Sequence, residues 1–136
     1  MIKIVVASNE PDLRALIEII LKSSGYHCLF VENFQEVVTL LQNSSIDLLL
    51  FRATLVDNGR ELVAIEPELQ KIGVIWLVTK RYGVDEERVH LEFIDRYLWI
   101  PISPEELIDA VRDVLSKYGH SEPSEATAFR RKYRLK

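Results

Sequence analysis

Short runs of aliphatic and β-branched residues alternate along this chain with segments whose apolar residues recur at helical spacing. The runs lie at Ile2–Ala7, His27–Val31, Leu48–Phe51, Val74–Val78 and Arg96–Ile100. A run that is apolar at both alternating positions is typical of a strand covered on both faces, as in a parallel sheet. Leu48–Phe51 and Val74–Val78 have this pattern. Five expected strands alternating with helices predict an α/β fold, a parallel sheet with right-handed crossovers and helices on both faces.

Helix start and stop signals lie between several of the runs. We expect Asn9, Asn33 and Ser103 to cap three helices, since each precedes an acidic or proline-containing first turn. Gly25 and Gly119 should end the first and the last of these helices.

Two further helices are less regular. One opens at Gly59, and Pro67 should end or bend it near Glu66, because proline lacks the N–H that a helix interior needs. The other is expected over Asp85–Phe93, where the apolar periodicity is poor.

Charge divides the chain into two parts. Residues 1–119 carry 12 basic and 19 acidic side chains, whereas residues 120–136 carry 5 basic and 2 acidic ones, so the net charges are −7 and +3. We therefore predict one acidic domain at 1–119, which is unsuited to non-specific nucleic-acid binding, and a flexible basic tail or linker at 120–136.

Several classes of protein are excluded by what the chain lacks. No apolar stretch is long enough to span a membrane and no signal peptide is visible, so a cytoplasmic location is expected. The single cysteine, Cys28, can form neither an internal disulfide nor a thiolate metal cage. No glycine-rich phosphate loop, serine elbow or zinc spacing is present, so no metal, cofactor or enzymatic activity is predicted.

Four segments carry a family resemblance. They read ASNEPDLR at 7–14, DLLLFR at 47–52, GREL at 59–62 and YLWIPISPEEL at 97–107. In these segments the chain resembles, over about residues 1–118, the receiver domain of bacterial two-component response regulators. The resemblance implies a flavodoxin-like (βα)5 fold with strand order 2-1-3-4-5, and a cis bond between Ile100 and Pro101.

Receivers of this family move a phosphoryl group from a kinase histidine to their own aspartate with the help of Mg²⁺. The resemblance places the site at the carboxyl ends of the strands, where α/β sheets bind ligands. Carried onto this chain, the family's functional positions hold other residues: Ser8 and Asn9 at the acidic pair, Arg52 at the acceptor aspartate, Val78 (or Thr79 with a one-residue slip) at the hydroxyl, and Ile100 at the lysine.

Arg52 decides the chemistry of this degenerate pocket. A guanidinium is not a nucleophile and stays protonated, and a like-charge pair 4 Å apart costs on the order of 4 kcal/mol at an effective dielectric near 20. We therefore predict a pseudo-receiver that neither binds Mg²⁺ tightly nor accepts phosphate. Glu10 or Asp57 could pair with Arg52. Arg52 itself could fix one signalling shape, read a small anion, or be a salt-bridged remnant.

A protein-binding surface is the function that remains. Tyr97 and Trp99 alternate on the expected fifth strand and therefore share a side. With Ile102 they mark the family's interaction surface, formed by the fourth helix, fifth strand and fifth helix, which suits a protein partner or a homodimer. Packing at the edge of the core, with Tyr97 a static aromatic rather than a switch, is the alternative.

The basic end offers two rival functions. The cluster is Arg130, Arg131, Lys132, Arg134 and Lys136. It could contact DNA or lead to an output domain, which would make the chain a DNA-associated transcriptional regulator, or it could be a solvated tail. The other rival is a small-anion sensor at the degenerate pocket. Protein binding without phosphorylation is the function that we expect.

Overall fold

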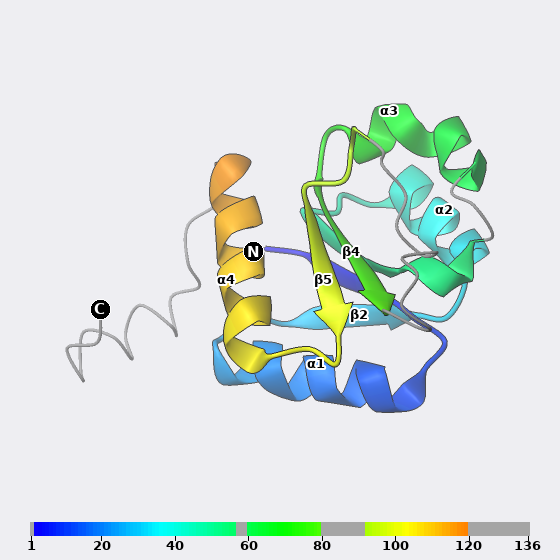
Figure 1. The fold of residues 1–136 in the computed structure, drawn as a ribbon. Coiled ribbons are helices and arrows are strands. Elements are labelled where there is room, and N and C mark those ends of the chain that lie inside the picture. Colours follow the sequence, from blue (N-terminus) through cyan, green and yellow to red (C-terminus); the bar gives the residue numbers. More distant parts are fainter. Residues whose placement is uncertain (1, 57–59, 80–91, 120–136) are drawn as a thin grey trace.

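A computed structural model describes residues 2–56, 60–79 and 92–119 of the chain (Figure 1). Its centre is one parallel sheet in the order β2-β1-β3-β4-β5, which confirms the predicted topology. The strands are β1 (Ile4–Ala7), β2 (Cys28–Val31), β3 (Leu48–Arg52), β4 (Gly73–Thr79) and β5 (Arg96–Ile100).

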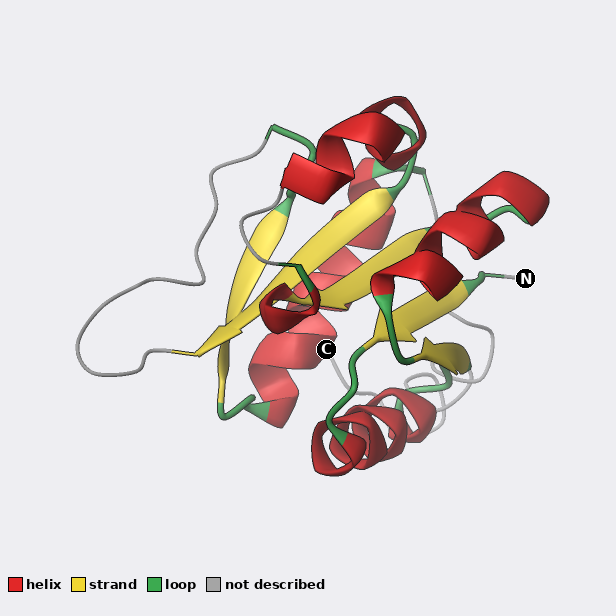
Figure 2. Cartoon of the chain, turned by 90° about the vertical axis from the view of Figure 1, so that its right-hand side faces the viewer, coloured by secondary structure: helices red, strands yellow, loops and turns green. Residues whose placement is uncertain are grey.

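Helices cover both faces of this sheet, as predicted (Figures 1 and 2). The helices are α1 (Pro11–Ser23) and α4 (Pro104–Lys117) on one face, and α2 (Phe34–Asn43) and α3 (Glu66–Leu69) on the other. Two 3₁₀ helices, η1 (Ala53–Leu55) and η2 (Arg60–Ile65), lie between β3 and α3. None of the helices described here is long and apolar enough to cross a membrane.

The sheet separates two apolar clusters, because successive side chains of a strand point to opposite faces. Leu48 and Leu50 of β3 pack with α1 and α4, whereas Leu49 and Phe51 pack against α2, η2 and α3. Burial of one such side chain contributes roughly 1.5–3 kcal/mol. Phe51 also stacks on Trp76, with ring centroids 4.9 Å apart and planes 13° from parallel. The central strands are therefore packed on both faces up to the carboxyl edge of the sheet.

Gly73 lets α4 approach the first residue of β4 closely. A Cβ at this position would lie 2.5 Å from Cγ1 of Val114 and 3.0 Å from Cδ1 of Leu48. Carbon atoms do not pack this closely, and the valine cannot move aside easily because it is stiff at χ1 in a helix.

Two predicted helix caps are confirmed and one is wrong. Asn33 Oδ1 accepts from Glu36 N at 2.9 Å, and Ser103 Oγ caps α4. The N-cap of α1, however, is Glu10 rather than Asn9, and it makes no side-chain capping bond. The reason is Pro11, which takes the first helical position and makes the residue before it the cap.

Gly25 and Gly119 follow the ends of their helices with φ of 85° and 84°, as the predicted stops require. The predicted bond between Ile100 and Pro101 is cis, as expected.

The segment before β4 differs from the single weak helix that was predicted. It is a six-residue 3₁₀ helix, η2, followed by the four-residue α3, with Pro67 in the first turn of α3. Proline is tolerated there because the first N–H groups of a helix have no intrahelical acceptor. Most of the helix expected over Asp85–Phe93 lies outside the described residues, and residues 92 and 93 form a turn.

Candidate functional site

The degenerate pocket is assembled where β1, β3, β4 and β5 end. Arg52 is aligned with Leu77 of β4, and Thr79 with Ile100 of β5. Aligned residues of parallel strands point to the same side, and so do residues two apart on one strand. Arg52, Thr79 and Ile100 therefore share the face of the sheet that α1 and α4 cover.

The hydroxyl position is settled by the same alternation. Val78 is fully buried in the opposite cluster, beside α2 and α3, and is aligned with Trp99. Its side chain therefore does not reach the face of Arg52. Thr79, the alternative that the one-residue slip allowed, lies on that face with Ile100.

Arg52 lies at the end of β3 with its side chain only 1% exposed. Its Nε donates to Oε1 of Glu10 at 3.1 Å, and its Nη1 donates to the carbonyl oxygen of Leu77 at 3.0 Å. The predicted pairing with Glu10 is confirmed. Asp57, the other predicted partner, lies outside the described residues.

The electrostatics of this pair are asymmetric. A guanidinium keeps its charge in a protein, and removal of a buried charge from water costs several kcal/mol unless it is paired and hydrogen-bonded. Arg52 is fully buried, whereas the Glu10 side chain is 40% exposed and remains partly solvated. The carboxylate therefore neutralises the cation from the solvent side, and the two hydrogen bonds tie β3 to β4 and to the loop before α1.

Ser8 and Asn9, at the positions of the expected acidic pair, behave differently from each other. Ser8 is fully buried, its Oγ accepts from Glu10 N at 3.0 Å, and its own N donates to Val31 O at 3.0 Å. Asn9 is exposed. Ser8 thus orients the backbone that carries Glu10 toward Arg52. Within the described residues, no group of three or more histidine, cysteine, aspartate or glutamate side chains could hold a metal ion.

The predicted interaction residues do not form one surface. Tyr97 and Trp99 are half-buried and pack against the cluster on the α2 and α3 face. Ile102 is 7% exposed and belongs to the cluster on the opposite face, with α1 and α4. The structure therefore leaves Tyr97 and Trp99 as the accessible aromatics of β5 and places Ile102 in the core.

Two polar features of the structure, one in the site and one at the opposite end of the sheet, could not be predicted from the sequence. The carbonyl of Leu77 is an acceptor for Arg52, but every residue carries such a carbonyl and only the register of β3 and β4 selects it. A second polar cluster, around Asp95, forms at the other end of the sheet. An aspartate just before a strand is common, so the sequence position of Asp95 does not indicate that its carboxylate accepts several hydrogen bonds.

Comparison with known proteins supports the receiver resemblance. No protein-family model matches the chain. The phosphate regulon transcriptional regulatory protein PhoB of Pseudomonas aeruginosa is 30% identical in an alignment of 123 residues, which covers 85% of this chain and 52% of PhoB. The TorCAD operon transcriptional regulatory protein TorR of Escherichia coli is 31% identical in an alignment of 114 residues, which covers 82% of this chain and 49% of TorR. The chain spans about half the length of these curated relatives.

Solved structures share the fold. The signal receiver domain of an HD domain-containing protein from Pseudomonas fluorescens aligns with a TM-score of 0.74 and 21% identity over 86% of this chain and 88% of that one. A CheY-like receiver domain protein from Methanospirillum hungatei gives 0.72 and 21% over 87% and 96%. The receiver domain of a sensor histidine kinase from Pseudomonas aeruginosa, with magnesium in its active-site cleft, gives 0.70 and 22% over 84% and 97%. With the strand order, these similarities show that the chain has the fold of response-regulator receiver domains, and its sequence is similar to about half of two transcriptional regulators.

Proposed function

We propose that this receiver domain acts in signal transduction by binding another protein, without being phosphorylated. The observation that carries the proposal is Arg52, whose guanidinium lies at the end of the central strand and bonds to Glu10 and to the Leu77 carbonyl. Transfer of a phosphoryl group needs a carboxylate nucleophile at this point, and a guanidinium cannot serve as one.

The same pair opposes metal binding. The kinase receiver domain described above coordinates magnesium in its cleft. Here Ser8 and Asn9 offer neutral oxygens, the buried cation repels a divalent ion, and Glu10 is already bonded to that cation. We therefore expect Mg²⁺ to bind this cleft only weakly, because among the described residues of the site Arg52 repels it and Glu10 is already paired.

Phosphorylation is tested with acetyl phosphate or a phosphorylated histidine kinase, followed by intact-mass measurement. The expected result is no added phosphate, and no change in tryptophan fluorescence with submillimolar Mg²⁺. The control is the variant Ser8→Asp, Asn9→Asp, Arg52→Asp, which restores the family's carboxylates and should gain Mg²⁺ binding. A phosphorylated aspartate in the unmodified chain would refute the proposal.

The binding surface that we propose lies on β5 and α4. Most of the third segment that the family resemblance assigns to it, residues 85–93, lies outside the described residues. Tyr97 and Trp99 are its accessible aromatics, and half-exposed aromatics are enriched at protein interfaces. Trp99→Ala should weaken self-association in sedimentation experiments or the capture of a partner. Leu29→Ala, on the far edge strand β2, is the control, since Leu29 is also exposed and apolar. If Trp99→Ala associates as the unmodified chain does, this surface is not the binding surface.

A second candidate function is suggested by the relatives, both of which are named as transcriptional regulators and are about twice as long as the matched region. In this case either the basic tail contacts DNA directly, or the domain controls a contact with DNA that is made elsewhere. A mobility shift that weakens with salt and disappears when residues 120–136 are deleted would favour this function. A shift that survives the deletion would exclude the tail as the contact.

A further inference from the structure

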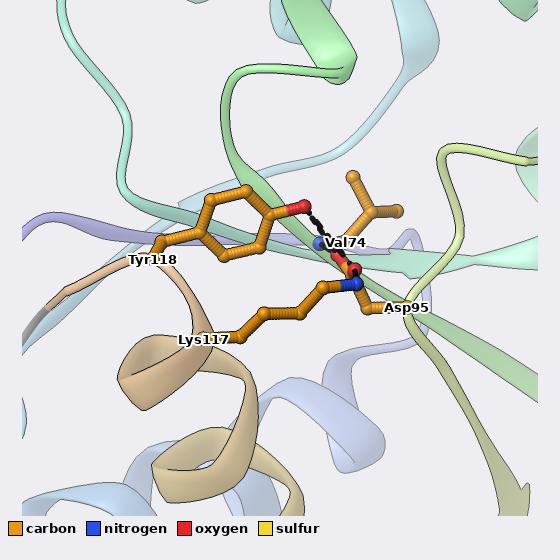
Figure 3. Close-up of polar contacts among 4 residues, drawn as sticks. All are labelled: Val74, Asp95, Lys117 and Tyr118. Carbon is orange, nitrogen blue, oxygen red and sulfur yellow. Dashed lines mark hydrogen bonds and ion pairs between the residues drawn. The ribbon is translucent and has the colours of Figure 1, made fainter.

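Asp95 lies just before β5, at the amino end of the sheet and therefore opposite Arg52 (Figure 3). Its side chain is 4% exposed and accepts hydrogen bonds from three residues. Oδ2 accepts from the Val74 amide at 2.8 Å, and Oδ1 accepts from Lys117 Nζ at 2.6 Å. The hydroxyl of Tyr118 lies 3.1 and 3.2 Å from the two carboxylate oxygens.

These contacts connect three elements at one point. The Asp95 amide also donates to the Val74 carbonyl at 2.9 Å, so the residue is bonded to β4 by backbone and side chain together. Lys117 is the last residue of α4, and Tyr118 is its C-cap. A single carboxylate therefore joins the start of β4 and the entry to β5 to the end of α4.

The bonds are of the strong kind. A buried carboxylate is costly unless its oxygens are hydrogen-bonded, and here they accept from an ammonium group, an amide and a phenol. The Lys117 side chain is 63% exposed, so solvent screens that contact, and the less exposed amide and phenol bonds carry more of the stabilisation. Burial also raises the pKa of the Tyr118 hydroxyl and keeps it a donor.

The rest of α4 is held independently of Asp95. Its buried residues Leu107, Val111 and Leu115 pack into the cluster shared with α1. The last turn is different, since residues 116, 117 and 119 are exposed and Tyr118 is only partly buried. The hydrogen bonds to Asp95, together with the partial packing of Tyr118 against that cluster, fasten this turn.

We propose that Asp95 is a latch that holds the last turn of α4 against the amino ends of β4 and β5, and so fixes the point at which the chain leaves the domain after Gly119. Asp95 is a positioning residue, and its effect is local to that turn. Opening of the latch releases residues 116–119 while the apolar stripe keeps the remainder of α4 in place.

The test is amide hydrogen exchange on the full chain, comparing Asp95→Asn with Asp109→Asn. The control changes an exposed acid on the same helix, 4.0 Å from Arg112. In Asp95→Asn we expect exchange at residues 116–119 and at the Val74 amide to rise at least about tenfold, and that of α1 and β1 to change less than about threefold. The control should leave both regions unchanged.

Limited trypsin digestion gives an independent readout. Cleavage after Lys117 should be several times faster in Asp95→Asn, with cleavage after Arg14, near the start of α1 at the opposite end of the sheet, unchanged. Equal acceleration of exchange across the whole domain would overturn the proposal, because Asp95 would then support the fold rather than the helix end. Unchanged exchange at residues 116–119 would overturn it as well.

If Asp95→Asn does not fold, Tyr118→Phe and Lys117→Met each remove one side chain's hydrogen bonds to Asp95. Tyr118→Phe carries both readouts, whereas Lys117→Met, which removes the trypsin site, is followed by hydrogen exchange alone. Tyr118→Phe should accelerate exchange at residues 116–119 more than Lys117→Met does, since the phenol bond is less exposed than the ammonium contact. The reverse order, or no local effect in either variant, would contradict the latch.

Discussion

A single guanidinium changes what the carboxyl end of this sheet can do. The sequence alone indicates that Arg52, Ser8 and Asn9 lie at the family's functional positions, because the segments around them match the receiver motifs. The sequence limits the acidic partner of Arg52 to two candidates, Glu10 and Asp57. It does not choose between them, because separation along the sequence does not show which side chain reaches the end of the strand. The choice between Val78 and Thr79 depends on strand register, and a one-residue slip reverses every side chain.

At this scale, Glu10→Gln should destabilise the protein, because it removes the charge that neutralises buried Arg52. We expect a loss of about 1–3 kcal/mol in the free energy of unfolding, at the lower end of the buried-pair range since Glu10 is partly solvated. Chemical denaturation measures the loss. Glu32→Gln, which breaks the exposed pair with Arg14, should cost less than about 1 kcal/mol and is the control. Equal losses would contradict the account.

Cys28 should react slowly with alkylating agents. Burial, and then the charge of Glu18, raise the pKa of its thiol to about 11. The thiolate is the reactive form, so at pH 8 alkylation in the native chain should be on the order of a hundredfold slower than in the denatured chain. Iodoacetamide labelling followed by mass spectrometry gives both rates, and similar rates would show that the thiol is not shielded.

Among the elements, the strands were the most predictable, because a short apolar run in an α/β fold typically forms a buried strand of the sheet. The last strand was predicted to the residue, at Arg96–Ile100. Helix starts were less certain, since Asn9 and Pro11 are both start signals and only one residue can be the cap. The 3₁₀ geometry of η2 has no periodic signature strong enough to separate it from a weak α-helix.

Asn33 and Asn9 provide a test of which predicted N-cap residue stabilises its helix. Asn33→Ala should cost about 1 kcal/mol of stability, because its side chain accepts the bond from the Glu36 amide. Asn9→Ala should cost less than about 0.5 kcal/mol, because Asn9 is exposed and Glu10 takes the cap position. Thermal or chemical unfolding of the two variants side by side measures both effects. A larger loss for Asn9→Ala would mean that α1 is capped as the sequence suggested.

For the molecule as a whole, three groups make stability depend on pH in the same direction. Hydrogen bonding to Asp95 raises the pKa of Lys117, and burial raises the pKa of Tyr118 and of Cys28. A raised pKa means that the folded chain holds the proton more tightly than the unfolded one. Its stabilising effect is complete below the unfolded pKa and is lost as the pH rises through the folded pKa.

The free energy of unfolding should therefore fall from about pH 9 upward, first through Cys28 and then, above about pH 10, through Tyr118 and Lys117. Urea denaturation at several pH values between 8 and 11 measures this slope. In Cys28→Ser the early part of the decline should vanish, and in Asp95→Asn the later part should become shallower. Parallel curves for all three proteins would contradict these assignments.

The absence of a side chain at Gly73 has a consequence for related chains. There is no room between β4 and Val114 for even one methyl group, so α4 and the strand touch at a separation that no other residue type permits. A receiver with alanine at this position needs either a residue smaller than valine at the position of Val114 or a last helix that lies farther from the sheet. In the second case an aspartate equivalent to Asp95 would fall short of that helix, and the two positions should change together when such chains diverge.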